Sequence, residues 1–283
     1  MSATPFKTPV VDALSVRVLV DSRYERFLPR LSHAHVQVEH VGRIVGRPDM
    51  TLACEWGLSL HLASEAAGAK AQYVLDFGYT PEIINRNFDL LNVDPKAING
   101  LILSHGHLDH FGGLNGFVSK HRGAMRDDLA LYVGGETIFR TKWVKEGGET
   151  TPWCTLERAT LEAQKVMPVC CPQPHALEGA FTSGYITRDS FEEVTGGSLV
   201  ADDHYTEAEA PRQTGKGHSP RRTRHLLHRQ RQGPGSDFIV RPHRRYQHRT
   251  QRHGGGQRRQ SARRDRRLSS GHLTGGVFAA HTA

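Results

Sequence analysis

The residues with the clearest capacity for chemistry lie in one short stretch of the 283-residue chain. Three histidines and one aspartate fall within six consecutive positions, in the run Ser104-His105-Gly106-His107-Leu108-Asp109-His110-Phe111-Gly112-Gly113. Neutral imidazole nitrogen and carboxylate oxygen are preferred ligands of zinc, and catalytic zinc sites leave one position open for water. The spacing therefore predicts a metal site and disfavours a surface cluster of histidines without function.

The order of the four ligand-type residues predicts two ions side by side. Ligands at positions i and i+2 of an extended turn point the same way, so we expect His105 and His107 to share one ion. Asp109 and His110 lie one step further round the turn and are expected to face a second ion a few ångströms away.

The glycines of this run have expected structural roles of their own. Gly106 is expected to let the backbone bend between ligands. Gly112 and Gly113 are expected to let the following element approach closely.

Short strands and helices are predicted to position the run. Strands are expected at residues 15–21, 72–78, 98–103 and 129–133, and a helix at 155–166. A further helix is expected to begin at Pro81, with Thr80 as its N-cap. Its apolar face carries Ile84 and Phe88, and Pro95 marks the stop. Strands that alternate with helices predict a layered α/β architecture.

Charge is divided very unevenly along the chain. Residues 212–267 hold 17 Arg and one Lys against two Asp, a local charge of +16, so the remainder carries −8. A mildly acidic body is thus joined to a strongly basic segment with few apolar residues. Such a segment cannot compensate for its ordering entropy, so we expect residues 212–270 to be disordered.

Composition excludes several classes of protein. No apolar run approaches the ~18 residues of a membrane span, and the first residues do not read as a secretory signal peptide. Four cysteines cannot form a disulfide scaffold in a chain of this length. We expect a cytoplasmic protein in which Cys154, Cys170 and Cys171 are inert thiols instead of a redox or metal site.

The motif His-x-His-x-Asp-His after an apolar strand resembles the signature of the metallo-β-lactamase superfamily. Further stretches resemble one subgroup of it, the dihydropterin/ribofuranosylaminobenzene-phosphate synthase-like metallo-hydrolases. They are Glu55-Trp56-Gly57-Leu58-Ser59, Asp76-Phe77-Gly78, Leu103-Ser104-His105-Gly106-His107, Tyr132-Val133-Gly134-Gly135-Glu136 and Thr182-Ser183-Gly184-Tyr185-Ile186-Thr187-Arg188. The resemblance runs from about residue 50 to 206. It implies a four-layer αββα sandwich and a metal-dependent hydrolase.

The resemblance also implies roles for the site residues. His105 and His107 would bind the first metal, and Asp109 and His110 the second. A hydroxide held by the metals would attack an ester, amide or phosphoester of a small molecule, and Asp109 is the expected catalytic residue. Zinc, as two ions, is the expected cofactor, with manganese or iron as alternatives. Asp76 resembles an aspartate that orients a ligand histidine, although a strand-end turn residue is an equal alternative.

The chain departs from the family pattern near residue 207. Gly271-His272-Leu273 resembles the last histidine motif of the family, so His272 is expected to be a further metal ligand. No counterpart of the preceding motif, Cys-Gly-His-x-Gly, occurs between residues 212 and 267. Read one base later, suitable codons for residues 227–251 permit an apolar strand followed by that motif. We therefore hypothesise that two compensating indels frame the basic segment.

The sequence predicts three regions and leaves two further functions open. Residues 1–211 are expected to form an incomplete metallo-β-lactamase-like domain, 212–270 the Arg-rich segment, and 271–283 a remnant of the last ligand motif. Taken as written, the Arg-rich arm would bind nucleic acid or serve a nuclease. Alternatively, the chain is a catalytically impaired metal-binding protein. A small-molecule substrate, incidental nucleic-acid binding and no membrane partner are expected, and the oligomeric state is left open.

Overall fold

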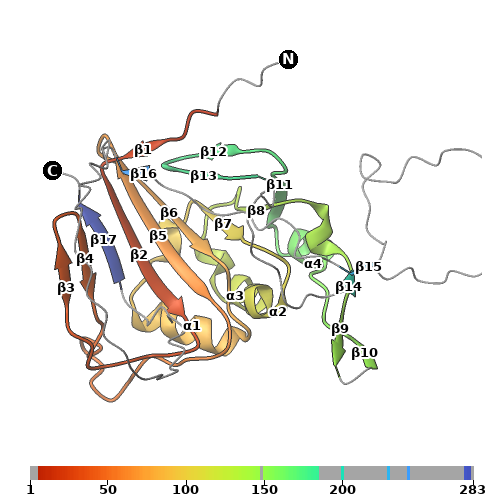
Figure 1. Ribbon diagram of the computed structural model, residues 1–283, viewed down its shortest axis with the longest axis horizontal. Helices are drawn as coiled ribbons and strands as arrows, with labels where there is room; N and C mark the ends of the chain where they lie inside the picture. The colour runs from red at the N-terminus through yellow and green to blue at the C-terminus, as the bar shows by residue number, and fades with distance from the viewer. Residues whose placement is uncertain are drawn as a thin grey trace, which may run out of the picture.

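A nine-stranded mixed sheet forms the frame of the protein (Figure 1). The structure is a computed structural model that describes residues 6–146 and 149–184, together with short strands at 199–200, 228–229, 241–242 and 277–281. In spatial order the strands are β11 (Met167–Cys170), β8 (Ala130–Val133), β7 (Gly100–Leu103), β6 (Ala69–Leu75), β5 (Ser59–Ala66), β2 (Ala13–Val20), β17 (Val277–His281), β4 (Val36–Glu39) and β3 (Leu31–His33). β6, β7, β8 and β11 are parallel, and the other neighbouring pairs are antiparallel.

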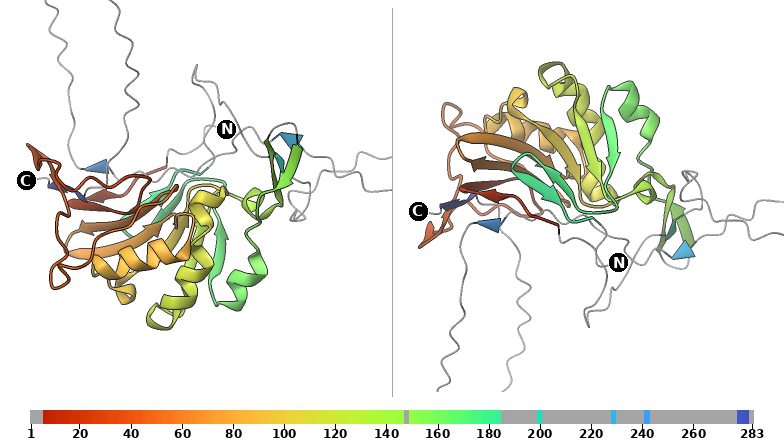
Figure 2. Two further views of the ribbon diagram at one scale, coloured as in Figure 1. Left: turned by 90° about the horizontal axis from the view of Figure 1, so that it is seen from below. Right: turned by 90° about the horizontal axis from the view of Figure 1, so that it is seen from above.

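A helical segment connects each parallel strand to the next one along the chain. The connections contain α1 (Pro81–Leu90), α2 (Leu108–Phe111) with α3 (Leu114–His121), and α4 (Arg158–Ala163), and the 3-10 turns η1 (Pro95–Ala97), η2 (Arg122–Ala124) and η3 (Glu136–Phe139). Figure 2 shows the orange to green helices gathered along one face of the sheet. Because parallel strands joined in this way run in the same direction, their carboxyl ends and the loops that follow them meet at one edge of the sheet.

Both faces of the central strands are buried. On the helix face, Val74, Leu101 and Leu131 pack against Phe88 and Phe117 of the helices. On the other face, a second cluster contains Leu62, Ala71, Tyr73, Ile102 and Ala180. Ala180 belongs to the hairpin β12 (His175–Leu177) and β13 (Ala180–Thr182), which covers this face. Strands buried on both sides read as continuous apolar runs, as the run before the histidines does.

The expected α/β class is confirmed, and most predicted elements are present. Strands occur within or near each of the four expected ranges, and α1 begins at Pro81 as predicted. The helix expected at 155–166 is shorter, since α4 covers only Arg158–Ala163. It ends where Lys165 adopts φ 57°, in the left-handed region. The helices and the large sheet form two of the four expected layers. On the face of the sheet opposite the helices, β13 contributes Ala180 to the buried core.

A residue distant in sequence holds the segment that leads into α1. Thr80 occupies the N-cap position, but its hydroxyl makes no cap hydrogen bond to the helix. Glu55 instead binds the residues just before the helix, since its Oε1 accepts from the backbone N–H groups of Tyr79 and Thr80 at 2.8 and 2.9 Å. The N-cap position was thus predicted correctly, but the Thr80 hydroxyl donates to Glu55 instead of accepting from the helix.

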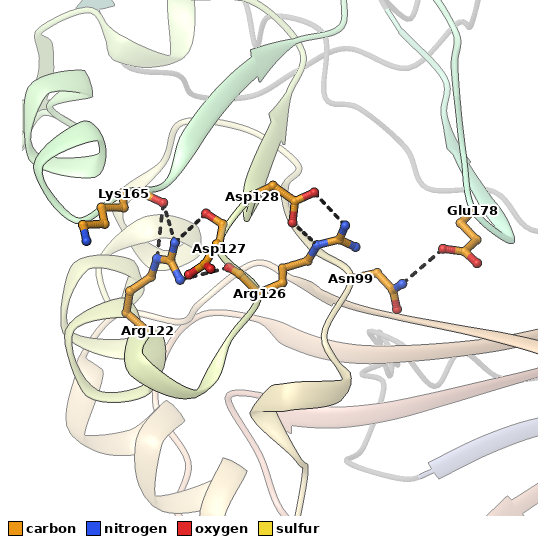
Figure 3. Close-up of polar contacts among 7 residues, drawn as sticks. All are labelled: Asn99, Arg122, Arg126, Asp127, Asp128, Lys165 and Glu178. Atoms are coloured by element: carbon orange, nitrogen blue, oxygen red, sulfur yellow. Dashed lines mark hydrogen bonds and ion pairs between the residues drawn. The ribbon is translucent and has the colours of Figure 1, made fainter.

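The edge of the sheet opposite the histidines is held by Arg122 (Figure 3). Its guanidinium donates to the carbonyl oxygens of Gln164 and Lys165, at the end of α4, and to those of Arg126 and Asp127, just before β8. One side chain therefore joins the starts of two neighbouring parallel strands, β8 and β11.

The remaining strands are short. β9 (Lys142–Glu146) pairs with β10 (Glu149–Pro152) and with β14 (Leu199–Val200), which pairs with β15 (His228–Arg229). β1 (Val10–Val11) pairs with β16 (Arg241–Pro242). Apart from β15 and β16, the segment expected to be disordered, 212–270, lies outside the described residues. No helix in the described ranges is long and apolar enough to cross a membrane.

Candidate metal centre

The predicted ligands lie at the carboxyl edge of the parallel strands. Asp76 directly follows β6, and Ser104 to His107 directly follow β7. His107 has an extended backbone, with φ −89° and ψ 149°, and is the N-cap of α2. Asp109 and His110 therefore lie on the first turn of α2, and the carbonyl oxygen of His110 accepts from the backbone N–H of Phe77 at 2.7 Å.

The structure brings the three histidine rings together. The ring centroids of His105 and His107 are 4.5 Å apart, and those of His105 and His110 are 4.1 Å apart. The His105 ring is thus about equally close to the rings of His107 and His110. The sequence spacing predicts two separate ligand pairs, whereas in the structure the three histidines form one cluster. The ring centroid of Trp153 lies 5.0 Å from that of His107.

Asp76, at the end of β6, binds His110 and Ser104 of this cluster. Its side chain is buried, and Oδ2 lies 2.7 Å from Nδ1 of His110. The same carboxylate accepts from the backbone N–H of Ser104 at 2.8 Å, through Oδ1, and from the Ser104 hydroxyl at 2.7 Å, through Oδ2. Asp76 also has φ 58°, a left-handed conformation typical of a turn at the end of a strand. It therefore matches both interpretations made from the sequence: it is a strand-end turn residue, and it binds a histidine of the motif.

Asp109 has one oxygen that no described group satisfies. Oδ2 lies 3.5 Å from Nε2 of His110, whereas the buried Oδ1 has no hydrogen-bond partner among the described residues. A buried carboxylate oxygen without a partner is costly unless a cation or a water satisfies it. The orphaned Oδ1 and the adjacent imidazole nitrogens are the donor types that zinc accepts, so in kind the residues fit the metal.

The charges of the cluster are strongly coupled. Burial, reinforced by the neighbouring His110 and His107, lowers the pKa of His105 to about 3. Burial likewise lowers the pKa of His107. Burial alone would also lower the pKa of His110, but hydrogen bonds and charge from Asp109 and Asp76 outweigh it and raise the pKa to about 9. At neutral pH the metal-free cluster thus holds two neutral imidazoles and one imidazolium.

Lys142, which no sequence pattern identified, lies beneath the ligand loop. Its side chain is 1% exposed, and Nζ donates to the carbonyl oxygens of Ile138 at 2.7 Å and Arg140 at 3.1 Å. A Cβ on Gly106 would lie 2.8 Å from Cε of Lys142. Gly106 is absent from the described glycines with positive φ, so it is needed for the close approach of this lysine more than for an unusual bend.

The other glycines around the loop also permit close backbone contacts. A Cβ on Gly112 would lie 2.2 Å from the carbonyl oxygen of Tyr79, and one on Gly113 would lie 2.2 Å from that of Phe77. The predicted role of these two glycines is therefore confirmed. Gly57, with φ 138°, fits in the same way against the carbonyl oxygen of Asp109.

The described residues alone do not assemble a complete metal site. In residues 6–146 and 149–184, no group of three His, Cys, Asp or Glu side chains is arranged to hold a metal ion. His272, the fifth predicted ligand, lies outside the described residues. The donor types of His105, His107, Asp109 and His110 nevertheless fit zinc.

The thiols are free and take no part in the cluster. All four cysteines are unpaired, and Cys171 is buried. Burial and the neighbouring Glu136 raise the pKa of Cys170 to about 12. This is the behaviour of an inert thiol.

Two residues that support the ligands were missed from the sequence. Ser104 stands next to His105, and its position immediately before the motif was the available signal. No sequence signal pointed to Lys142, because only the position of β9 in the fold brings this lysine next to the ligand loop.

Comparison with known proteins agrees with the motif. The profile of the Metallo-beta-lactamase superfamily matches residues 67–124. A curated relative, the 7,8-dihydropterin-6-methyl-4-(beta-D-ribofuranosyl)-aminobenzene-5'-phosphate synthase of Methanocaldococcus jannaschii, is 42% identical over 64 residues. This match spans 23% of the chain and only 22% of the relative's length.

Solved structures that resemble the chain are more distant. The metallo-beta-lactamase fold protein YhfI from Bacillus subtilis is 11% identical, with a TM-score of 0.34 over 67% of this chain and 57% of that one. An N-acyl homoserine lactone hydrolase is 12% identical, with a TM-score of 0.32 over 68% of this chain and 71% of that one. At TM-scores this low, the superpositions say nothing about the site.

Proposed function

We propose that the chain is a metal-dependent hydrolase of small molecules, because residues 67–124 match the profile of the Metallo-beta-lactamase superfamily. The bond cleaved is that of an ester, an amide or a phosphoester. The observation that carries the proposal is the cluster of three histidine rings, at centroid distances of 4.1 and 4.5 Å, beside an Asp109 oxygen without a partner.

Four described residues would hold the metal, with His272 as a fifth. His105 and His107 would serve one ion, and Asp109 and His110 a second, in the chain's intact form. Zinc is the proposed metal, and manganese or iron suits the same donors. When bound, such ions supply an activated water and polarise the oxygen of the electrophile.

The chain's own residues prepare this site in specific ways. Burial keeps His105 and His107 neutral, which leaves nitrogen lone pairs available for binding. Asp76 orients the ring of His110 through Nδ1, so that Nε2 faces Asp109. Asp109 is the proposed catalytic residue.

The substrate class follows only from resemblance. The name of the curated relative favours a pterin-linked sugar phosphate, while the fold itself sets no substrate. A test panel should therefore include a phosphomonoester, a phosphodiester, a lactone, a thioester and a β-lactam.

The proposal is tested by measuring metal content and hydrolysis in the full chain. The protein is loaded with Zn²⁺, desalted and assayed for bound zinc by mass spectrometry, beside a His105→Gln variant. The exposed His33, changed to Gln, is the matched control. We expect zinc to be retained by the wild type and the control and lost by His105→Gln, with hydrolysis of one panel substrate following zinc content. Hydrolysis that survives in His105→Gln, or a wild type with neither zinc nor activity, contradicts the proposal.

The basic segment needs a separate test, because it decides whether the site is complete. We propose that residues 212–270 result from two compensating indels, which resequencing of codons 200 to 280 would reveal. A gene whose bases forbid the Cys-Gly-His-x-Gly reading removes this explanation. The chain would then be a metal-binding protein with an impaired site.

Nucleic-acid binding is the second candidate, favoured by the local charge of +16 in residues 212–267. Phosphate contacts of this kind release counterions, so binding should weaken steeply with salt. Deletion of residues 212–267, which leaves β17 in place, should abolish binding to RNA or DNA without restoring hydrolysis. Binding that persists after the deletion contradicts this candidate.

We also propose a cytoplasmic location and a small-molecule partner, with no membrane partner. Four free cysteines without a disulfide support a reducing compartment. Fractionation of cells that express the tagged chain tests the location.

A further inference from the structure

The hydroxyl of Ser104 lies between a buried carboxylate and a predicted ligand. Its Oγ is 2.7 Å from Oδ2 of Asp76 and 3.0 Å from Nδ1 of His105. Both distances are within the range of a hydrogen bond. The backbone N–H of the same serine donates to Oδ1 of Asp76, which holds the residue against the carboxylate through two contacts.

Counting protons assigns a direction to each of these contacts. A serine hydroxyl has one proton to donate, and a carboxylate can only accept. The hydroxyl proton therefore goes to Asp76, and Oγ turns a lone pair toward His105. The short contact to His105 is then a hydrogen bond only if Nδ1 of that ring carries a proton.

The Asp76 carboxylate also accepts a hydrogen bond from a second imidazole ring, that of His110. Nδ1 of His110 lies 2.7 Å from Oδ2 of Asp76 and must also be the donor there. Asp76 thus acts on His110 directly and on His105 through one hydroxyl. In both rings Nδ1 contacts the protein. Nε2 of His110 faces Oδ2 of Asp109 at 3.5 Å, and Nε2 of His105 is the nitrogen that would bind a metal.

We propose that Ser104 is a positioning residue that fixes His105 in the Nδ1–H tautomer and so presents its Nε2 for metal binding. The proposal rests on the metal site of the proposed function. Without the hydroxyl, neither the tautomer nor the rotation of the ring is set, since each is determined by the hydrogen bond of the other nitrogen.

The test reads the tautomer in the metal-free protein, independently of any hydrolysis. Long-range ¹H–¹⁵N spectra of the full chain, labelled with ¹⁵N-histidine, distinguish protonated Nδ1 from protonated Nε2. The His105 signals are assigned by their loss in His105→Gln. We expect the Nδ1–H form in the wild type and the Nε2–H form, or a mixture, in Ser104→Ala.

Two further variants separate positioning from simple folding. Ser104→Thr keeps the hydroxyl and should restore the Nδ1–H form. Ser104→Cys keeps the volume with a poor hydrogen-bonding group and replaces Ser104→Ala if the alanine variant does not fold. The exposed Ser22, changed to Ala, should leave the His105 signals unchanged.

Affinity for Zn²⁺ provides the second readout. Competition with a chelating dye should show Zn²⁺ binding weakened about 10- to 100-fold in Ser104→Ala or Ser104→Cys, and close to wild type in Ser104→Thr and Ser22→Ala. A wild-type His105 in the Nε2–H form, or an unchanged tautomer in both Ser104→Ala and Ser104→Cys, overturns the proposal. A protein that shows the predicted tautomers but hydrolyses nothing refutes the proposed function and leaves the role of Ser104 standing.

Discussion

Glu55 and Thr80 are joined by two hydrogen bonds in which Glu55 is the acceptor both times. Its Oε1 accepts from the backbone N–H of Thr80 at 2.9 Å, and its Oε2 accepts from the hydroxyl at 2.7 Å. The carboxylate thus occupies the amino end of α1, where the helix dipole favours negative charge. The contact also connects α1 to the loop that precedes β5, and this loop lies against the carbonyl oxygen of Asp109 at Gly57.

Replacement of Glu55 by Ala should therefore destabilise the protein by about 1–3 kcal/mol, because two backbone donors and a hydroxyl lose a charged acceptor. Urea unfolding of the metal-free chain measures the change. Glu65→Ala is the matched control, since Glu65 forms only a solvent-exposed ion pair with Lys70 and should cost little. Equal costs for the two variants would refute the stabilising role of these Glu55 contacts.

The raised pKa of His110 predicts that stability depends on pH. Folding raises this pKa from 6.5 to about 9, so the stabilisation is fully present below pH 6.5 and is lost as the pH rises through about 9. The difference in unfolding free energy between the metal-free wild type and His110→Gln should accordingly shrink between pH 6.5 and 9. Measurements of urea unfolding at several pH values test this. A constant difference for His110→Gln would contradict the assignment.

Gly106 and Lys142 should be energetically coupled. A Cβ at position 106 would lie 2.8 Å from Cε of Lys142 and 3.0 Å from Cγ1 of Ile138, and the buried lysine is held by two carbonyl oxygens. We expect Gly106→Ala to cost about 1–3 kcal/mol in the wild type and less in a Lys142→Ala background. Gly123→Ala, where no atom lies within 4 Å of the added Cβ, should be close to neutral. Strict additivity of the two changes would show that the lysine does not limit this position.

Two neighbouring arginines should differ sharply in their contribution to stability (Figure 3). Arg122→Ala removes five hydrogen bonds to carbonyl oxygens and should lower the unfolding free energy by about 1–3 kcal/mol. Arg126 pairs only with Asp128 on an exposed surface, so Arg126→Ala should change stability little. Thermal unfolding compares the two variants, and a larger loss for Arg126→Ala would be inconsistent with these contacts.

Cys170 should react slowly with alkylating reagents. Burial and Glu136 raise the pKa of its thiol to about 12, which leaves little thiolate at pH 8. Treatment of the native chain with iodoacetamide at pH 8, followed by mass spectrometry, should modify the exposed Cys154 well before Cys170. Unfolding in urea should remove the difference. Equal rates in the native chain would show that the network around Glu136 does not protect the thiol.

Patterns local in sequence predicted much of the fold. The apolar spacing of Ile84 and Phe88 identified α1, and both side chains are buried. Continuous apolar runs identified β7 and β8, because these strands are covered on both faces. α4 was predicted too long, since composition does not reveal that Lys165 takes a left-handed conformation and that Arg122 binds the carbonyl oxygens there.

The site was predictable in its residues and less so in its geometry. The run from His105 to His110 was found by type and spacing alone. Its arrangement depends on α2, which begins after His107 and turns His110 back to within 4.1 Å of the His105 ring. Asp76 and Ser104 are 28 positions apart, and only the parallel pairing of β6 and β7 brings them together.

Position 76 is restricted by two demands that few residue types can meet at once. Its φ of 58° is tolerated well only by Gly, Asn and Asp. Its three contacts, to the Ser104 N–H, the Ser104 hydroxyl and the His110 ring, all call for an acceptor. Glycine meets the first demand alone, and glutamate the second alone. Asparagine meets the first but must turn an NH₂ group toward a donor. If all twenty amino acids are tested at position 76, only aspartate should therefore preserve the folded protein.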